Sequence, residues 1–388
     1  LIVVDPVESE TAADADTLVQ PDPGTDLALA RAVLARLVET DRIDREFVAS
    51  HTDGFETLVD SLPTVADAAA TAGVPVETVE EIAAAFESPT LLYWGMGVNQ
   101  STHGTDAART LINCCLATGN MGPGTGPFSL TGQANSMGVR VCASKGTFPG
   151  QRAFDDETAR ATVADTWDVP LSRLPEPTGP GPVGIVDKIN RGHVDAVWTV
   201  ATNPVAGMPD ASNVARALDD VFLVAQDAFR SETVEHADVV LPAATWGETE
   251  GTTTNMERRV SRVTAVSDVT DGVRQDLDII AAVGNRIESD LFDDPPLAPE
   301  AVFDELRELT AGTVADLSGI TYDRLDRELA VRWPAPDESS EGGYRYHDDG
   351  EWTFPTASGN ARFATATFDG VPEPTNPAYP LVLTTGRR

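Results

Sequence analysis

The sequence of 388 residues has a formal net charge of -35 at pH 7, and Lys145 and Lys188 are its only lysines. A surface this acidic repels nucleic acid and anionic membranes, which excludes both as expected partners. A hydrophobic content of 41% argues against disorder. Because the carboxylates are spread along the whole chain, we favour adaptation to high salt, which screens their repulsion, over a basic partner.

Neither end of the sequence resembles a natural terminus, since it opens inside one apolar strand and closes directly after another. We therefore expect an internal fragment of a larger polypeptide. No apolar run approaches the length of a membrane span. The cysteines form no C-x-x-C pair, so they hold neither zinc nor an iron–sulfur cluster by themselves. We expect Cys114 and Cys115 to be buried thiols in a reducing, cytoplasmic setting, whereas Cys142 lies beside a glycine- and arginine-bearing loop.

The first elements place polar groups at the ends of strands and helices. The opening strand ends at Asp5, whose carboxylate can accept ribose hydroxyls or cap the helical turn that follows, and capping is the commoner outcome. After a turn at Gly24, Thr25 or Asp26 is expected to cap a helix over 27–39. The Asp26 carboxylate can also accept two N–H groups of a guanine. Further helices are expected over 43–55 and 64–86.

The stretch around residues 90–140 organises the chain. An apolar run over 91–94 predicts a buried parallel strand, which breaks into Gly95-Met-Gly97 and a polar loop. A helical pattern over 107–118 and a glycine-rich loop over 122–132 follow. This order is typical of an open α/β sheet that binds an extended phosphate-bearing ligand at its carboxyl edge. The spacing is not G-x-G-x-x-G, so the residues alone indicate only a nucleotide-like ligand.

Three further apolar strands predict a second parallel sheet, because short helical patterns alternate with them. Asn203 follows the first of these strands, and Gln226 and Asp227 follow the second. Carboxyl ends of parallel strands meet at one edge, so repeated polar groups there indicate a ligand cleft. The strands are expected over 196–201, 221–225 and 238–241, and the helices over 185–191 and 211–218.

The remaining segments are expected to be connections, surface structure and short elements. A loop-like composition over 335–350 predicts a domain boundary there. We expect a surface excursion or linker over 148–182, a polar loop over 247–259 ending in Arg258 and Arg259 that make ion pairs, a helix over 277–287, a solvent-facing acidic segment over 298–329, β-like structure over 352–367 and a strand over 379–385.

Several motifs occur in one consistent order along nearly the whole chain. They are Trp94-Gly-Met-Gly-Val-Asn-Gln100 joined to Gly126-Pro-Phe-Ser-Leu-Thr-Gly-Gln133, then Thr199-Val-Ala-Thr-Asn-Pro204, Ala237-Asp-Val-Val-Leu-Pro242, Glu250-Gly-Thr-Thr-Thr-Asn-Met-Glu-Arg-Arg259 and Leu383-Thr-Thr-Gly-Arg387. In these motifs the sequence resembles the large subunit of molybdopterin oxidoreductases, the dimethyl sulfoxide reductase family. The segment Asn99-Gln-Ser-Thr-His-Gly104 and the segment Met137-Gly-Val-Arg140 are most similar to assimilatory nitrate reductases.

The resemblance implies an α/β fold with two Rossmann-like parallel-sheet domains flanking a cofactor cleft, plus the start of a C-terminal dinucleotide-binding β-barrel. The implied domains are residues 1–135, residues 136–340 with the excursion 148–182, and residues 341–388, which hold a linker and the start of the barrel. It also implies molybdenum held by two molybdopterin guanine dinucleotides, with a 4Fe-4S cluster on a missing N-terminal part. No metal ligand is assigned within this sequence.

The resemblance carries cofactor contacts onto matching positions. One dinucleotide is expected at Asp5, Ser9, Gly24, Thr25 and Asp26, with the pterin along Met96 and Gln100, the other nucleotide at Asn203, Gln226, Asp227 and Asp276, and the C-terminal lobe at Thr385, Gly386 and Arg387. Two positions depart from the family pattern. Thr249 replaces a frequent lysine, which weakens one phosphate contact, and Val141 replaces the acidic residue that follows the family arginine.

The resemblance implies oxygen-atom transfer from nitrate to give nitrite, with electrons from a donor such as ferredoxin. Arg140 is the candidate catalytic residue because a guanidinium offers charge and forked donors to an anion. A structural arginine that satisfies loop carbonyls is an equal alternative. His103 is expected to be a hydrogen-bonding loop residue rather than an acid or base. The fragment alone is expected to be inactive.

Two other functions remain open at the level of the sequence. The first is a formate dehydrogenase of the same family, which should carry a histidine beside the active-site arginine, and no histidine adjoins Arg140. The second is a structural iron–sulfur subunit of the NADH dehydrogenase type, which keeps the fold without molybdenum. The many matched cofactor positions argue against the second.

Overall fold

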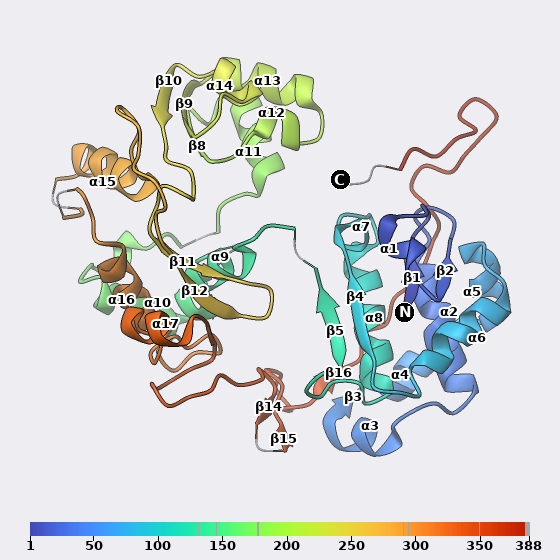
Figure 1. Cartoon of the computed structure of the whole chain (residues 1–388). Helices are drawn as coiled ribbons and strands as arrows, with labels where there is room; N and C mark the ends of the chain where they lie inside the picture. Colours follow the sequence, from blue (N-terminus) through green and yellow to red (C-terminus); the bar gives the residue numbers. More distant parts are fainter. Residues whose placement is uncertain are drawn as a thin grey trace. The chain divides into compact units, whose positions relative to one another are not determined.

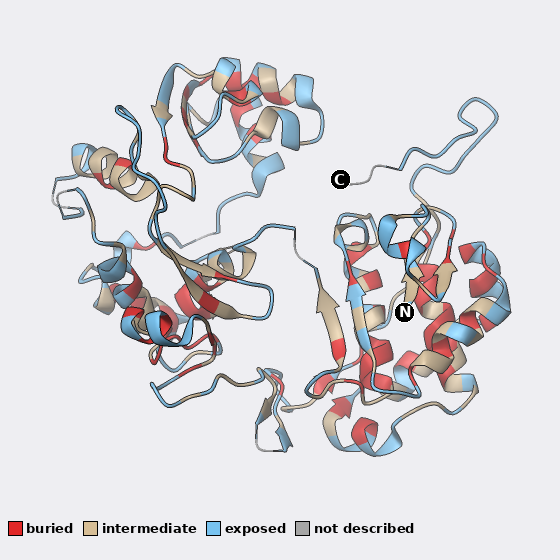
Figure 2. Cartoon of the chain, viewed as in Figure 1, coloured by how far each residue is buried: buried red, intermediate tan, exposed pale blue. Residues whose placement is uncertain are grey.

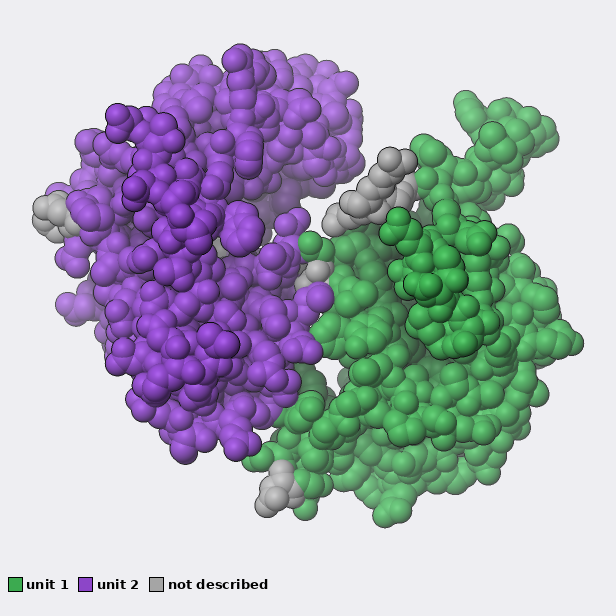
Figure 3. All heavy atoms as spheres, viewed as in Figure 1, with its two compact units in different colours: residues 1–132, 344–388 green, residues 133–343 purple. Residues whose placement is uncertain are grey.

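The computed structural model describes every residue except Thr131, Lys145, Pro177, Asp290, Asp294, Asp349 and 385–388. The described chain is mixed α/β and divides into two compact units (Figures 1 and 3): unit 1 holds residues 1–132 and 344–388, and unit 2 holds residues 133–343. Both units contain parallel strands, which confirms the expected α/β class with parallel sheets. The expected cofactor cleft and the start of a C-terminal β-barrel stay predictions.

Three pairs of parallel strands form the β structure around which the helices of unit 1 are arranged. The pairs are β1 (Ile2–Val4) with β2 (Thr17–Val19), β3 (Thr52–Asp53) with β16 (Ala361–Arg362), and β4 (Leu91–Trp94) with β5 (Gly126–Ser129). A short antiparallel pair joins β14 (His347–Asp348) to β15 (Glu351–Trp352). The helices are α1 (Glu10–Ala13), α2 (Asp26–Glu39), α3 (Arg45–His51), α4 (Phe55–Asp60), α5 (Val65–Ala72), α6 (Val76–Ala85), α7 (Met96–Asn99) and α8 (Gly104–Ala117).

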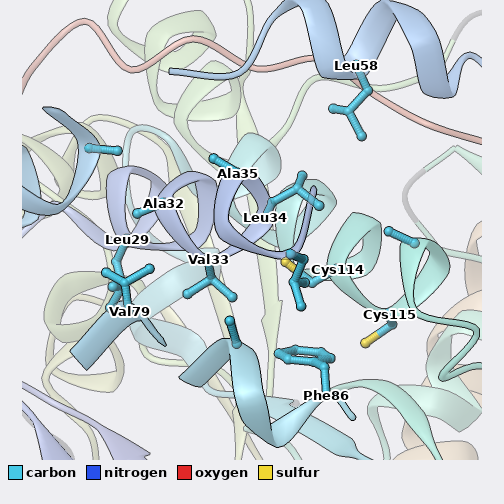
Figure 4. Close-up of a cluster of buried hydrophobic side chains, with 14 of the residues drawn as sticks. Leu29, Ala32, Val33, Leu34, Ala35, Leu58, Val79, Phe86, Cys114 and Cys115 are labelled. Carbon is cyan, nitrogen blue, oxygen red and sulfur yellow. The ribbon is translucent and has the colours of Figure 1, made fainter. Parts of the chain in front are cut away.

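Helix α2 is the centre of the core of unit 1. Its apolar residues recur at helical spacing, so one broad face packs against α5, α6 and α8, and Leu34 and Leu37 are fully buried. Figure 2 shows this burial along the helix, and Figure 4 shows Cys114 and Cys115 of α8 in the same cluster. Both are free buried thiols, as expected, and burial raises the pKa of Cys115 to about 12.

Arginines rather than lysines make the ion pairs at the end of α2. Arg36 and Arg42 both bind the carboxylate of Glu80 on α6, at 2.5 and 2.6 Å, and Arg42 also binds Glu87. These hydrogen bonds, first from Arg42 and then from Arg36, lower the pKa of Glu80 to about 2. The acidic residues Glu80 and Glu87 therefore hold these two arginines in place.

Unit 2 contains the expected second parallel sheet. Its order is β10 (Val239–Pro242), β9 (Phe222–Asp227), β8 (Ala196–Val200), with Leu223 fully buried in the cluster beneath it. A second, antiparallel sheet has the order β11 (Gly251–Thr254), β12 (Arg259–Val263), β13 (Val331–Arg332). A short hairpin joins β6 (Thr147–Phe148) to β7 (Arg152–Ala153). The helices are α9 (Ser136–Cys142), α10 (Glu157–Thr166), α11 (Pro182–Asn190), α12 (Pro204–Gly207), α13 (Ala211–Asp219), α14 (Glu232–Glu235), α15 (Asp276–Ile287), α16 (Pro299–Thr310) and α17 (Tyr322–Glu328), with 3-10 turns at Pro149–Gln151 and Leu171–Arg173.

Two expected surface segments, residues 298–329 and 247–259, are packed or paired parts of unit 2, so those two expectations were wrong, whereas the surface excursion expected over 148–182 stays a prediction. The acidic segment 298–329 buries an apolar side on both α16 and α17, around Trp333. The segment 148–182 contains α10, which packs on α16 through a small cluster of its own. The loop expected over 247–259 forms most of the hairpin β11–β12, because four cross-strand pairs hold it in register.

Tertiary pairing also overrode local patterns in unit 1. The helix expected over 43–55 breaks at β3, because Thr52 and Asp53 pair with β16. The strand β4 is parallel as expected, but Leu91 and Tyr93 are exposed because, in the part of the chain that the structure describes, its sheet has two strands. The strand expected over 379–385 is also wrong, since residues 379–384 form only a bridge from Tyr379 to Asn376.

Candidate functional site

The strand ends of β1 and β2 in unit 1 position five of the expected ligand residues. Asp5 accepts a hydrogen bond from the Val7 amide at 2.8 Å, and Ser9 accepts from the Ala12 amide at 3.3 Å as the N-cap of α1. Both side chains therefore accept hydrogen bonds from nearby backbone amides, and a bound ligand would have to share these acceptors with the backbone.

Thr25 is the N-cap residue of α2, one of the two expected positions, but its side chain does not make the expected cap hydrogen bond. The buried Thr25 hydroxyl donates to the Asp22 carbonyl at 2.6 Å, so it makes no cap hydrogen bond. Asp26 lies half-buried in the first turn of α2, and among the described residues its carboxylate has neither a hydrogen-bond donor nor an ion-pair partner. Gly24 has a φ of +85°, a conformation that favours glycine. The loop thus presents, at a helix start, a carboxylate that no described residue pairs with.

Residues 95–104 follow β4 and hold the two expected pterin contacts. Gly95 and Gly97 are open: a Cβ built on either meets no atom within 4 Å. Met96 is half-buried, whereas Gln100 is exposed and its side chain makes no hydrogen bond to a described residue. No packing within the described chain requires the two glycines, and such open glycines allow the backbone to approach a ligand.

Asn99 fixes this loop, and sequence reasoning did not single it out. Its Oδ1 accepts from the Trp94 indole N–H at 3.0 Å, and its Nδ2 donates to the Ser129 hydroxyl at 3.0 Å and approaches the Met96 sulfur at 3.7 Å. The side chain thereby joins the ends of β4 and β5. The signal in the sequence was Trp94 itself, because a buried indole N–H requires an acceptor.

In unit 2 the ends of β8 and β9 bring the second group of expected residues together. Gln226 is 1% exposed, and its Nε2 donates to Asp276 at the start of α15 at 2.6 Å. The Asn203 amide donates to Glu232 at 2.6 Å, which lowers the pKa of that carboxyl, and accepts from Thr233. The Gln226 Oε1 is buried without a donor among the described residues. An orphaned acceptor at a strand end fits a site for a ligand or water that donates.

A groove of about 410 Å³ lies beside these strand ends. Asp227, Pro242 and the exposed ion pair of Arg230 with Glu235 line it, together with apolar side chains. Phe229 in its wall is 72% exposed, so an aromatic face is available there. A larger hollow of about 920 Å³, near α15 and α16, contains none of the expected site residues.

Arg140 lies in the last turn of α9, also in unit 2. It is half-buried, and its guanidinium has no hydrogen-bond or ion-pair partner among the described residues. Asn135 anchors the start of this helix, because its Oδ1 accepts from the Thr254 amide at 2.8 Å. Gly138 leaves room for that contact, since a Cβ there would lie 2.2 Å from Asn135 Oδ1. Asn135 is a second residue that sequence reasoning missed.

A match to a family model establishes which protein family the chain belongs to. The model for molybdopterin oxidoreductase matches residues 1–286. The chain belongs to the molybdopterin oxidoreductase family.

Three relatives of this molybdopterin oxidoreductase chain match over its whole length. The assimilatory nitrate reductase of Haloferax mediterranei is 61% identical over 54% of its own length, which also supports the expected adaptation to high salt. The assimilatory nitrate reductase catalytic subunit of Bacillus subtilis is 34% identical over 55% of its length, and the F420-dependent formate dehydrogenase subunit alpha of Methanocaldococcus jannaschii is 34% identical over 56%. The chain thus spans about half the length of these relatives.

A solved structure agrees with the fold of the molybdopterin oxidoreductase chain. Acetylene hydratase from Pelobacter acetylenicus matches 97% of this chain and 53% of its own, with a TM-score of 0.69 and 18% identity. At that identity the likeness shows the fold alone.

Family membership supports a molybdenum–pterin cofactor, and the described residues fit such a group. The Gln226 Oε1 and the Asp26 carboxylate, neither of which has a partner among the described residues, and the open glycines are features that an extended, hydrogen-bonding ligand would satisfy. Within the described part of the chain, no three histidine, cysteine or carboxylate residues gather as metal ligands. No described helix is long and apolar enough to cross a membrane. Thr385, Gly386 and Arg387 lie outside the described residues.

Proposed function

We propose that the whole protein reduces nitrate to nitrite in nitrate assimilation. The observation that carries this proposal is the identity of 61%, along the whole chain, to the assimilatory nitrate reductase of Haloferax mediterranei, against 34% to the formate dehydrogenase subunit of Methanocaldococcus jannaschii. Nitrate loses one oxygen, which leaves as water after the uptake of two electrons and two protons, and nitrite is released.

The cofactor in this proposal is molybdenum held by two molybdopterin guanine dinucleotides. When bound, it would supply the two electrons and accept the oxygen atom. The unpaired Asp26 carboxylate would accept the N–H groups of one guanine, and the open backbone at Gly95 and Gly97 would follow the pterin. The remaining contacts of the first nucleotide and pterin would come from Asp5, Ser9, Gly24, Thr25, Met96 and Gln100, those of the second nucleotide from Asn203, Gln226, Asp227 and Asp276, and those of the C-terminal lobe from Thr385, Gly386 and Arg387.

Electron supply completes the proposal. A 4Fe-4S cluster on another part of the protein would pass electrons from a donor such as ferredoxin. A cytoplasmic location is supported by the three free thiols, because an oxidising compartment selects for paired cysteines.

Arg140 is proposed to bind and orient nitrate. Its support is chemical: the guanidinium is half-buried and has no partner among the described residues, so its donors and its charge are available to an oxyanion. The alternative, a structural arginine that satisfies loop carbonyls, would require acceptors, and none of the described residues provides one. Proton delivery needs no assigned side chain, because water can supply it during release.

Composition and turnover of the full-length protein test the function. We expect molybdenum and about two guanine nucleotides per chain, released on denaturation, and dye-linked turnover of nitrate but not formate. Formate turnover alone would replace nitrate reduction by formate oxidation. Protein that contains neither molybdenum nor nucleotide would instead support a structural subunit.

Variants of Arg140 test its role. Arg140→Met removes the charge-assisted hydrogen bonds, each worth roughly 1.5–3 kcal/mol, so kcat/KM for nitrate should fall by about 10- to 100-fold. Arg140→Lys keeps the charge without the fork and should recover part of that loss. Arg45→Met, which removes an exposed arginine from unit 1, is the matched control. Wild-type kcat/KM in Arg140→Met would rule out the proposed role.

A further inference from the structure

A segment near the C-terminal end of unit 1 contacts both of its candidate ligand loops, residues 22–26 and residues 95–104. We define the C-terminal strap as residues 361–371. It begins as β16, paired with β3, and its Phe363 ring lies 5.3 Å from that of Phe55. Asn113 of α8 then holds Ala364 by both its backbone groups, donating to the carbonyl at 2.8 Å and accepting from the amide at 3.4 Å. The strap is therefore anchored to the core before it reaches the loops.

His103 holds the far end of the strap. Its Nε2 lies 2.9 Å from the Gly370 carbonyl oxygen, and its ring packs on Phe368 at 5.2 Å between centroids. A carbonyl only accepts hydrogen bonds, so the proton is on Nε2 and the imidazole donates. The Asp369 carboxylate is near the same nitrogen at 3.5 Å. The side chain of His103 is only 17% exposed, which fits a positioning contact rather than a surface acid or base.

The next residue of the strap reaches the other loop. Val371 packs on Gly24, since a Cβ built on that glycine would lie 3.1 Å from the Val371 Cγ1. Gly24 precedes the buried Thr25 and the unpaired Asp26, and His103 ends the loop that holds Gly95 and Gly97. Adjacent strap residues, Gly370 and Val371, thus contact two loops that are far apart in sequence.

We propose that the strap sets the spacing of the two ligand loops and that His103 is the positioning residue that locks it. The proposal rests on the proposed function for the identity of the ligand, a guanine dinucleotide with its pterin. The backbone at Gly370 and Val371 contacts one loop with each residue, so a shift of either loop changes the position of the other. The loss of the His103 bond should therefore loosen the Gly24 loop, although His103 does not touch it.

Hydrogen exchange in the full-length protein, produced in a host that makes no molybdopterin, tests the coupling without any cofactor. In His103→Leu, amides over 22–26 should exchange about fivefold faster, the effect of one lost hydrogen bond on local opening. His103→Gln keeps an N–H donor and should exchange at close to the wild-type rate. Val371→Ala should accelerate exchange over 22–26 and, because the coupling is reciprocal, to a smaller extent over 99–104. His236→Leu, which removes a hydrogen-bonded histidine of unit 2, is the matched control and should change neither loop.

Cofactor content gives the second readout. In the cofactor-loaded full-length protein, His103→Leu should retain several-fold less guanine nucleotide after dialysis than His103→Gln. Faster exchange over 99–104 with unchanged exchange over 22–26 in His103→Leu would overturn the proposal. If His103→Leu does not fold, unchanged exchange over 22–26 in Val371→Ala would overturn it equally. Wild-type protein without nucleotide would instead refute the proposed function, and the exchange result would still decide the role of the strap.

Discussion

Adding one methyl group at Gly97 separates the needs of the fold from those of the ligand. Gly97 lies inside α7, is exposed, and has no atom within 4 Å of a built Cβ. In the fold alone, Gly97→Ala is therefore free of clashes. Because alanine has less conformational freedom to lose in a helix, the variant should be about 0.5–1 kcal/mol more stable without cofactor.

The same methyl group has the opposite effect if a ligand approaches this backbone. Forcing an extra methyl into filled space costs about 1–3 kcal/mol, which corresponds to about a 5- to 150-fold loss of affinity. A gain in stability of the cofactor-free protein together with a loss of bound nucleotide is thus the expected signature. A merely structural glycine would change both properties in the same direction.

Gly104→Ala is the matched control in the neighbouring helix. There the built Cβ lies 2.6 Å from the backbone carbonyl oxygens of both Val98 and Asn99, so the cofactor-free protein should lose about 1–3 kcal/mol. Thermal unfolding of cofactor-free protein and nucleotide content of loaded protein are the two measurements. Wild-type nucleotide content in Gly97→Ala would refute the assignment of this face to the ligand.

Two further predictions concern charge. The pKa of Glu80 is lowered from 4.5 to about 2 in the folded state, so the stability that its ionised carboxylate contributes is complete above pH 4.5 and is lost as the pH falls through 2. In urea titrations between these pH values, Glu80→Gln should weaken the dependence of the unfolding free energy on pH. An unchanged dependence would contradict the ion-pair network. The net charge of -35 predicts that the melting temperature falls on dialysis from 2 M to 0.1 M NaCl, because the screening length grows to about 10 Å at the lower salt and the carboxylates repel one another more strongly. A melting temperature independent of salt would argue against adaptation to high salt.

The sequence was most informative where one element decides its own structure. The apolar stripe of α2 and the alternation around β8, β9 and β10 depend on periods that local composition reveals. The acidic segment with α16 and α17 was misjudged because its charges hide an apolar side around Trp333. β3 could not be predicted locally, because its partner β16 lies at the other end of the chain.

The site shows the same division. Strand-end positions such as Asp5 and Gln226 follow from the topology of parallel sheets. The contacts of Asn99 with Ser129 and of His103 with Gly370 join distant segments, the second pair 267 positions apart, so no spacing rule reveals them. Among the described residues, no side chain pairs with Asp26 or Arg140, and this too depends on the tertiary structure rather than on local sequence.

The pairing of β3 with β16 has a consequence for biosynthesis. The carboxylate of Asp53 in β3 accepts a hydrogen bond from Ser358, which lies just before β16 and 305 positions later in the chain. This contact cannot form until Ser358 has been synthesised. At roughly 5–20 residues per second, a ribosome needs about 15–60 s to cover that interval. Unit 2, continuous over 133–343, emerges completely in that time. The fold of unit 1 is therefore completed only after unit 2 has been synthesised. Insertion of any ligand held by residues 22–26 and 95–104 becomes a late step of assembly.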